Sequence, residues 1–262
     1  MVSYDGTAYH GWQVQSSEPM TIEGQLNRVL SELTGETIQV IGASRTDAGV
    51  HALGNIAVFD TESSIPPASY TKALNGRLPW DIRIVDSYQV ADDFHPRHMD
   101  TKKTYVYHIY HGDICMPMDR LYNFHVYGPV DVDAMSRACK AFIGEHDFAA
   151  FCAAGSQAET TVRTIYELEV SVRPVVNSEK NSNINQEADM CNRGPEYIDI
   201  RVTGSGFLYN MVRIIAGTLL EVGRGRIKVD DISGIIASGD RAQSGPTLPA
   251  MGLVLDHYEF IQ

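Results

Sequence analysis

Segments with strand-like alternation and segments with helical periodicity follow one another in the same order in both halves of the chain. The clearest helix begins after Thr21, a suitable N-cap, and ends before Gly35. The expected helices are 21–35, 66–79, 131–144, 211–225 and 230–238. The expected strands lie in 2–12, 37–63 (two strands around a loop), 82–90, 102–111, 161–174, 196–209 and 252–260. This pattern predicts an α+β fold of two similar strand–helix–strand domains, residues 1–99 and 100–262.

A polar, asparagine-rich stretch separates two of the strands expected in the second domain, 161–174 and 196–209. Residues 175–194 offer few apolar side chains to bury, so we expect a long, mobile hairpin loop there. A hairpin connection implies that the two strands are antiparallel neighbours.

The composition is that of a soluble globular protein, with 44% hydrophobic and 21% charged residues. The sequence contains no apolar run of membrane-spanning length and no signal-peptide pattern at its start, so we expect a cytoplasmic protein. The four cysteines show no CxxC spacing, and neither a disulfide framework nor a zinc site is predicted. The formal net charge of −12 disfavours nucleic acid as a partner, although it permits a basic groove if the acidic residues lie elsewhere.

The most informative segment for chemistry is a glycine-bounded loop with the sequence GASRTDAGVHALGN, residues 42–55. Gly42 and Gly49 allow sharp bends, so the loop can present Asp47 at the end of a strand. Arg45 lies two residues before Asp47 and would point to the same side in extended backbone. A neighbouring arginine keeps a carboxylate ionised, which suits a nucleophile or an electrostatic stabiliser. The alternative interpretation is that Asp47 only forms the turn.

Other catalytic patterns fit this sequence poorly. The loop lacks the Lys-Ser/Thr ending of a phosphate-binding P-loop, and the chain contains neither a GxSxG elbow nor a zinc-binding HExxH helix. His95 and His98 have a spacing that could suit a metal, but Pro96 breaks a helix there and no third ligand follows. No metal site is predicted there.

A second candidate region joins basic residues to an aromatic strand. Arg97, His98, Lys102 and Lys103 precede the strand that begins at Tyr105. Cations for phosphates and rings for bases are what single-stranded nucleic acid needs from a protein. The alternative is a solvated basic entry to a strand whose tyrosines face the core.

Arg213 lies in an apolar helix, within the sequence GSGFLYNMVRII. A buried arginine without an acidic partner is costly, and Asp47 is the obvious candidate for that partner. An arginine at the helix edge that reaches solvent is the alternative.

The loop resembles the catalytic signature of the tRNA pseudouridine synthase A (TruA) family, an Arg-Thr-Asp followed by Gly-Val-His. Further blocks similar to that family follow its order: YDGTAYHGWQ, FHPR with KKTYVY, HDFAAFCAAGS, GSGFLYNMVR and the terminal GLVL. The resemblance covers nearly the whole chain. It implies an isomerase that converts uridine to pseudouridine at positions 38, 39 and 40 of the tRNA anticodon arm, without cofactor or catalytic metal. It also implies a homodimer in which two α+β domains are joined through an extended antiparallel sheet, with the active-site cleft between them.

The resemblance also assigns roles to residues. Asp47 would be the nucleophile, Arg45 would flip the target base and fill its place, Tyr105 would lie against the flipped uracil, and Arg213 would pair with Asp47. The expected RNA contacts, including the basic residues named above, are Phe94, His95, Arg97, His98, Lys102, Lys103, Gly155, Ser156 and Gln157. A base must leave the helical stack before its glycosidic bond can be broken and remade through carbon.

Two other functions are compatible with parts of the pattern. A non-catalytic RNA-binding module could use aromatic strands in the same way, but the RNP1 pattern is absent and such a module has no need for Arg45 and Asp47 in one turn. A phosphate-ester hydrolase with an aspartyl nucleophile would need a second carboxylate and a metal near Asp47, and the sequence RTDAGVH supplies neither.

Overall fold

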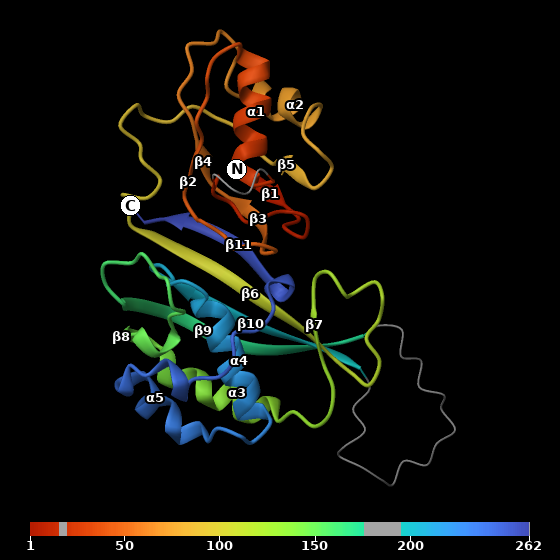
Figure 1. Cartoon of the computed structure of the whole chain (residues 1–262), viewed down its shortest axis with the longest axis vertical. Coiled ribbons are helices and arrows are strands. Elements are labelled where there is room, and N and C mark those ends of the chain that lie inside the picture. Colours follow the sequence, from red (N-terminus) through yellow and green to blue (C-terminus); the bar gives the residue numbers. More distant parts are fainter. Residues whose placement is uncertain (16–19, 176–194, 262) are drawn as a thin grey trace. The chain divides into compact units, whose positions relative to one another are not determined.

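The computed structural model describes residues 1–15, 20–175 and 195–261. The chain forms two compact units (Figure 1). The first unit contains Met1–Tyr105 and the C-terminal residues from Val254 onward, and the second contains Val106–Leu253. The border thus falls between Tyr105 and Val106 instead of between 99 and 100, and the C-terminal strand returns to the first unit.

The first unit is built on a sheet of short strands. The order is β5 (Ile82–Ile84), β1 (Val2–Tyr4), β3 (His51–Asn55) and β11 (Leu253–Phe260), followed by the start of β6 (Thr101–His111). Strand β1 runs antiparallel to β5 and β3, whereas β11 runs parallel to β3. A separate antiparallel pair, β2 (Ile41–Gly42) and β4 (Ala57–Val58), flanks the candidate loop in sequence.

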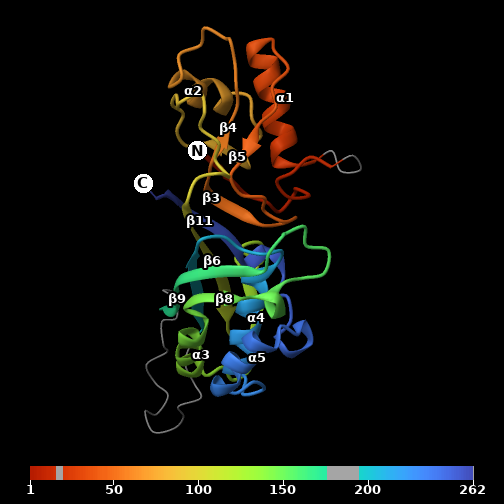
Figure 2. The ribbon, with the colours of Figure 1, turned by 90° about the vertical axis from the view of Figure 1, so that its left-hand side faces the viewer.

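Helices α1 (Ile22–Thr34) and α2 (Ser69–Asn75) belong to the first unit and lie side by side (Figure 2). The predicted caps of α1 are confirmed, because the Thr21 hydroxyl accepts a hydrogen bond from Gly24 N and Gly35 is left-handed with φ of 77°. The residues with helical spacing on one face of α1 are buried: Ile22, Leu26, Val29 and Leu30. Their burial fixes the helix in the first unit.

The second unit contains its own set of neighbouring strands, starting with the C-terminal part of β6. The strands that follow are β10 (Glu196–Gly204), β9 (Val162–Pro174) and β8 (Gly144–Asp147), and β7 (Phe124–Val126) pairs with β6. Strand β10 pairs antiparallel with β9 over its whole length, as the hairpin prediction requires. The loop predicted between them lies almost entirely outside the described residues.

The α-helices among the described residues of the second unit are α3 (Val132–Ala138), α4 (Met211–Gly223) and α5 (Ile232–Ser238). Helix α3 packs against α4, and Figure 1 shows α3 and α5 below the strands of this unit. The helix expected over 131–144 is wrong in its second half, since Cys139–Phe142 is a 3-10 turn and the next residues form edge strand β8. In the part of the chain that the structure describes, no helix has the length and apolar character needed to cross a membrane.

Candidate functional site

The loop that carries Asp47 connects β2 to β3 and is held by the backbone of the segment after β1. Trp12 N donates to Thr46 O at 2.9 Å, and Gly49 N donates to Tyr9 O at 3.2 Å. Gly49 has a φ of 77°, which requires the freedom of glycine. The loop is therefore fixed at both sides of Asp47 by main-chain hydrogen bonds.

A buried polar network lies beneath the loop. The Tyr4 hydroxyl and Thr46 Oγ1 are 2.7 Å apart, and Asn55 Nδ2 donates to both Tyr4 Oη, at 3.3 Å, and Ser44 O, at 3.0 Å. Asn55 Oδ1 accepts from Ser44 N at 3.3 Å, and the Asn55 side chain is fully buried. A satisfied polar network in a buried position specifies one conformation of the backbone around it.

The side chains of the loop alternate in direction. Ser44 and Thr46 are buried, whereas Arg45 is exposed and Asp47 is half-buried. With Ser44 and Thr46 anchored inward, the charged side chains of Arg45 and Asp47 lie on the outer side. This alternation is what extended backbone produces, since residues two apart point to the same side. The network thus positions Arg45 and Asp47 without contributing a reactive group itself.

Tyr105 on strand β6 lies close to this loop. Its ring is 8% exposed, and burial raises the pKa of its hydroxyl above the ordinary value; the nearby Tyr4 and the negative charge of Asp47 raise it further, while the Ser44 hydroxyl opposes the rise. The structure therefore brings Tyr105 within electrostatic range of Asp47. The phenol remains protonated at neutral pH.

Arg97 also reaches the loop. Its Nε donates to Gly42 O at 2.8 Å, at the point where the loop begins. Burial lowers the pKa of Arg97, and the positive charge of Arg45 lowers it further, so the two guanidinium groups are neighbours. Two neighbouring arginines place positive charge at this loop in a chain that is acidic overall, and the negative charge of Glu23 acts on Arg97 in the opposite sense.

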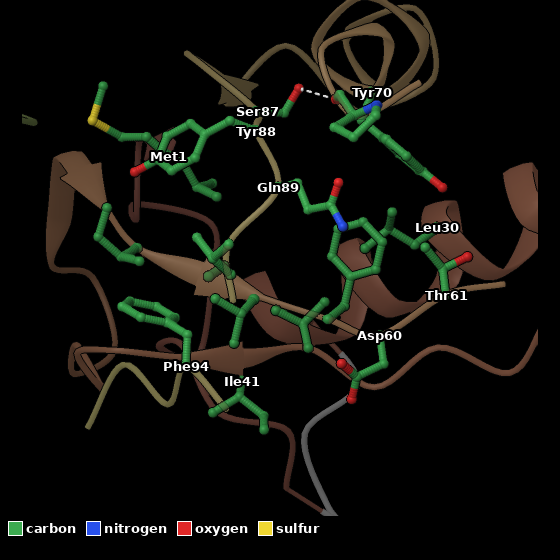
Figure 3. A pocket seen from close by; sticks show the side chains of 18 of the residues that line it. Met1, Leu30, Ile41, Asp60, Thr61, Tyr70, Ser87, Tyr88, Gln89 and Phe94 are labelled. Carbon is green, nitrogen blue, oxygen red and sulfur yellow. Dashed lines mark hydrogen bonds between the residues drawn. The ribbon is translucent and has the colours of Figure 1, made fainter. Parts of the chain in front are cut away.

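The remaining predicted RNA-binding residues of the first unit occupy varied environments. Phe94 packs edge-on against Phe260, with ring centroids 5.3 Å apart, and lines a pocket of about 610 Å³ (Figure 3). His95 and His98 stack with centroids 3.9 Å apart. Lys103 Nζ lies 5.3 Å from the centroid of the Tyr258 ring, and both Lys102 and Lys103 are half-buried.

The other predicted site residues belong to the second unit. Arg213 on α4 donates from Nε to Leu248 O at 2.6 Å and from Nη1 to Asn210 Oδ1 at 2.5 Å. The Gly155–Gln157 segment is a surface loop in which Gly155 is left-handed, with φ of 85°. Their grouping with Asp47 stays a prediction.

Sequence reasoning missed the supporting residues of the site. Local sequence patterns give no special role to Tyr4, Thr46 and Asn55, although their side chains form the network beneath the loop. One signal was present: asparagine is depleted in strands, so Asn55 next to apolar strand residues suggested a specific hydrogen-bonding role.

The raised pKa values of buried tyrosines predict alkaline destabilisation. Burial raises the pKa of Tyr4 and Tyr105, so both stay protonated in the folded chain while they ionise at about pH 10 in the unfolded chain. Their contribution to stability is present below about pH 10 and is lost above it, by up to about 1.4 kcal/mol per pH unit for each tyrosine. Denaturant unfolding between pH 7 and 11 should show this decline. Tyr105→Phe should make the decline shallower, and an identical slope in that variant would contradict the account.

Comparison with known proteins places this chain in a family. The family model described as tRNA pseudouridine synthase matches residues 1–99 and 138–260. The chain is 42% identical to tRNA pseudouridine synthase A 2 of Clostridium perfringens, over 97% of this chain and 96% of that protein. It is 44% identical to tRNA pseudouridine synthase A of Caldicellulosiruptor bescii, over 97% and 95% of the two chains. The protein of that name from Acetivibrio thermocellus is 43% identical, over 97% and 96%. The chain therefore belongs to the tRNA pseudouridine synthase family, whose members are isomerases.

Proposed function

We propose that this chain converts uridine to pseudouridine in tRNA, at positions 38, 39 and 40 of the anticodon arm. The names of the relatives support tRNA as the substrate. The observation that carries the proposal is the Asp47 loop, in which a buried network turns Arg45 and Asp47 outward beside Tyr105.

In the proposed reaction, the target nucleotide leaves the stack and Asp47 attacks it as a covalent nucleophile. Arg45 is exposed and lies two residues away, so its side chain can occupy the space that the flipped base vacates. The glycosidic C–N bond then breaks, the base turns, and a new bond forms between C5 of the base and C1′ of the ribose. The bond to Asp47 breaks again, which regenerates the carboxylate. The hydrogen on C5 is released to solvent as a proton, and N1 of the base takes up a proton in its place.

Tyr105 would lie against the flipped uracil in this scheme. A buried phenol with a raised pKa is a weak acid at neutral pH, and its ionised form is scarce. Stacking on the uracil and donating a hydrogen bond are therefore the roles that its environment favours. Before Tyr105 could remove the C5 proton, its phenol would have to pass its own proton to another group.

The second unit would supply Arg213 as the ionic partner of Asp47 and the 155–157 loop as an RNA contact. Arg97, with its guanidinium beside that of Arg45, would bind phosphate at the first unit. We further propose that the enzyme acts as a homodimer in the cytoplasm and needs no cofactor.

The proposal is tested by tritium release from a tRNA transcript labelled at C5 of its uridines. We expect the purified protein to release tritium to water, because each isomerisation replaces the C5 hydrogen with a C5–C1′ bond. A matched transcript with cytidine at positions 38, 39 and 40 should release none. Binding of tRNA without any tritium release would favour a non-catalytic RNA-binding module.

A further inference from the structure

Trp80 is the most unusual aromatic residue on the surface of the first unit. The chain contains two tryptophans; Trp12 is fully buried, whereas Trp80 is 93% exposed. An indole ring carries a large apolar surface, and leaving it in water forgoes the stabilisation that burial would give. An exposed tryptophan that is held in place therefore indicates a binding site.

The position of Trp80 is fixed from both sides. The guanidinium carbon of Arg83 lies 4.9 Å from the Trp80 ring centroid, which is a cation–π distance. Arg83 Nη1 also donates to Pro79 O at 2.6 Å and to Ile82 O at 2.7 Å. Ile82 is fully buried, so the turn that carries Trp80 is anchored in the core.

The same turn is tied to the segment that supports the Asp47 loop. Asp81, the residue after Trp80, accepts a hydrogen bond from the Tyr9 hydroxyl at 2.6 Å, and Asp81 O accepts from Asp5 N at 2.9 Å. The backbone oxygen of Tyr9 accepts from Gly49 N, within the Asp47 loop. A chain of direct contacts therefore joins Trp80 to the candidate site within one unit.

We propose that Trp80 and Arg83 form a stacking site for an unpaired base of the bound tRNA. This inference rests on the proposed function, since it assumes that tRNA is the substrate. An exposed ring beside Arg83 offers a face to a base, and the cation can bind the adjoining phosphate. Arg77 is exposed three residues before Trp80 and adds a second cation for the RNA backbone.

The surroundings of Trp80 favour RNA over a protein partner. Tryptophan and arginine are enriched at protein interfaces as well as in RNA-binding sites. The choice of RNA rests on the polyanionic substrate of the proposed function, to which the two arginines within three residues of Trp80 are complementary in charge. A single ring can stack on one base, and the cations beside it are complementary to the negative charge of its phosphate.

The first test uses the intrinsic fluorescence of the protein. Titration with tRNA transcript should quench the Trp80 emission of the wild-type protein as a base stacks on the indole. Trp80→Phe retains only the buried Trp12, and its emission should be unaffected by tRNA. Equal quenching in the two proteins, or none in the wild type at saturating tRNA, would overturn the inference.

The second test separates binding from chemistry. Trp80→Ala should raise KM for tRNA about tenfold and change kcat less than twofold, the loss expected for one stacked base. Trp80→Phe, which keeps a ring, should restore most of the affinity. Tyr88→Ala removes another exposed aromatic of the first unit, 64% exposed, and should leave KM unchanged. Unchanged KM in Trp80→Ala, with normal pseudouridine formation, would refute the stacking site and leave the proposed function standing. A wild-type protein that neither binds tRNA nor forms pseudouridine would refute both.

Discussion

Replacing Asp47 by alanine is expected to lower the rate of pseudouridine formation by at least about 10³-fold, because removing a covalent nucleophile costs several orders of magnitude. The side chain is half-buried, and main-chain hydrogen bonds of Thr46 and Gly49 hold the loop on both sides of it. The fold should therefore survive the substitution. Single-turnover rates of tritium release with excess enzyme measure the effect directly.

Two matched variants control this prediction. Asp47→Asn keeps the volume of the side chain and removes its charge, so it should be as inactive as Asp47→Ala. Asp60→Ala removes an exposed carboxylate of the same unit and should keep the wild-type rate. An active Asp47→Asn variant would show that the carboxylate does not attack the substrate, and the roles proposed for Arg45 and Tyr105 would then also be unsupported.

The largest expected loss of stability follows from adding one methyl group at Gly217. This residue lies in the interior of α4, where alanine is ordinarily better than glycine by about 1 kcal/mol. A Cβ at this position would lie 1.9 Å from the backbone oxygen of Pro246, which a side-chain rotation cannot relieve. We expect Gly217→Ala to cost about 3 kcal/mol and to lower Tm by roughly 10 °C.

Gly234 provides the matched control in helix α5. A Cβ built there meets no atom within 4 Å, so Gly234→Ala should leave stability unchanged or raise it by up to about 1 kcal/mol. Thermal unfolding of both variants, followed by circular dichroism, compares the same substitution in two settings. Equal melting temperatures would contradict the close packing of α4 on the segment around Pro246.

Much of the fold could be predicted because local signals agreed with the tertiary structure. Helix α1 has a capping threonine, an apolar stripe and a terminal glycine, and strand β6 has alternating aromatics. Strands β7 and β8 were missed because each is three or four residues long and is defined by its partner strand. The end of α3 was misplaced since residues 144–147 pair with β9, a contact that no local periodicity reports.

Only the outward-facing residues of the candidate site could be recognised from the sequence. The charged pair Arg45 and Asp47 could be recognised from spacing and from glycine, but the support beneath it depends on residues far apart in sequence. Tyr4 and Asn55 meet because β1 pairs with β3, and Arg97 meets Gly42 through a connection of 55 residues. Sequence patterns that carry no long-range contact information cannot supply these pairings.

We propose that pseudouridine formation in the tRNA anticodon arm takes place at the Asp47 loop. This proposal is tested most directly by mapping pseudouridine at single-nucleotide resolution in a transcript treated with the wild-type protein or with Asp47→Ala. Carbodiimide labelling followed by primer extension should give new stops at uridines 38, 39 and 40 with the wild type and none with the variant. Stops at the same positions with Asp47→Ala, or stops confined to other parts of the tRNA with the wild type, would contradict the claim.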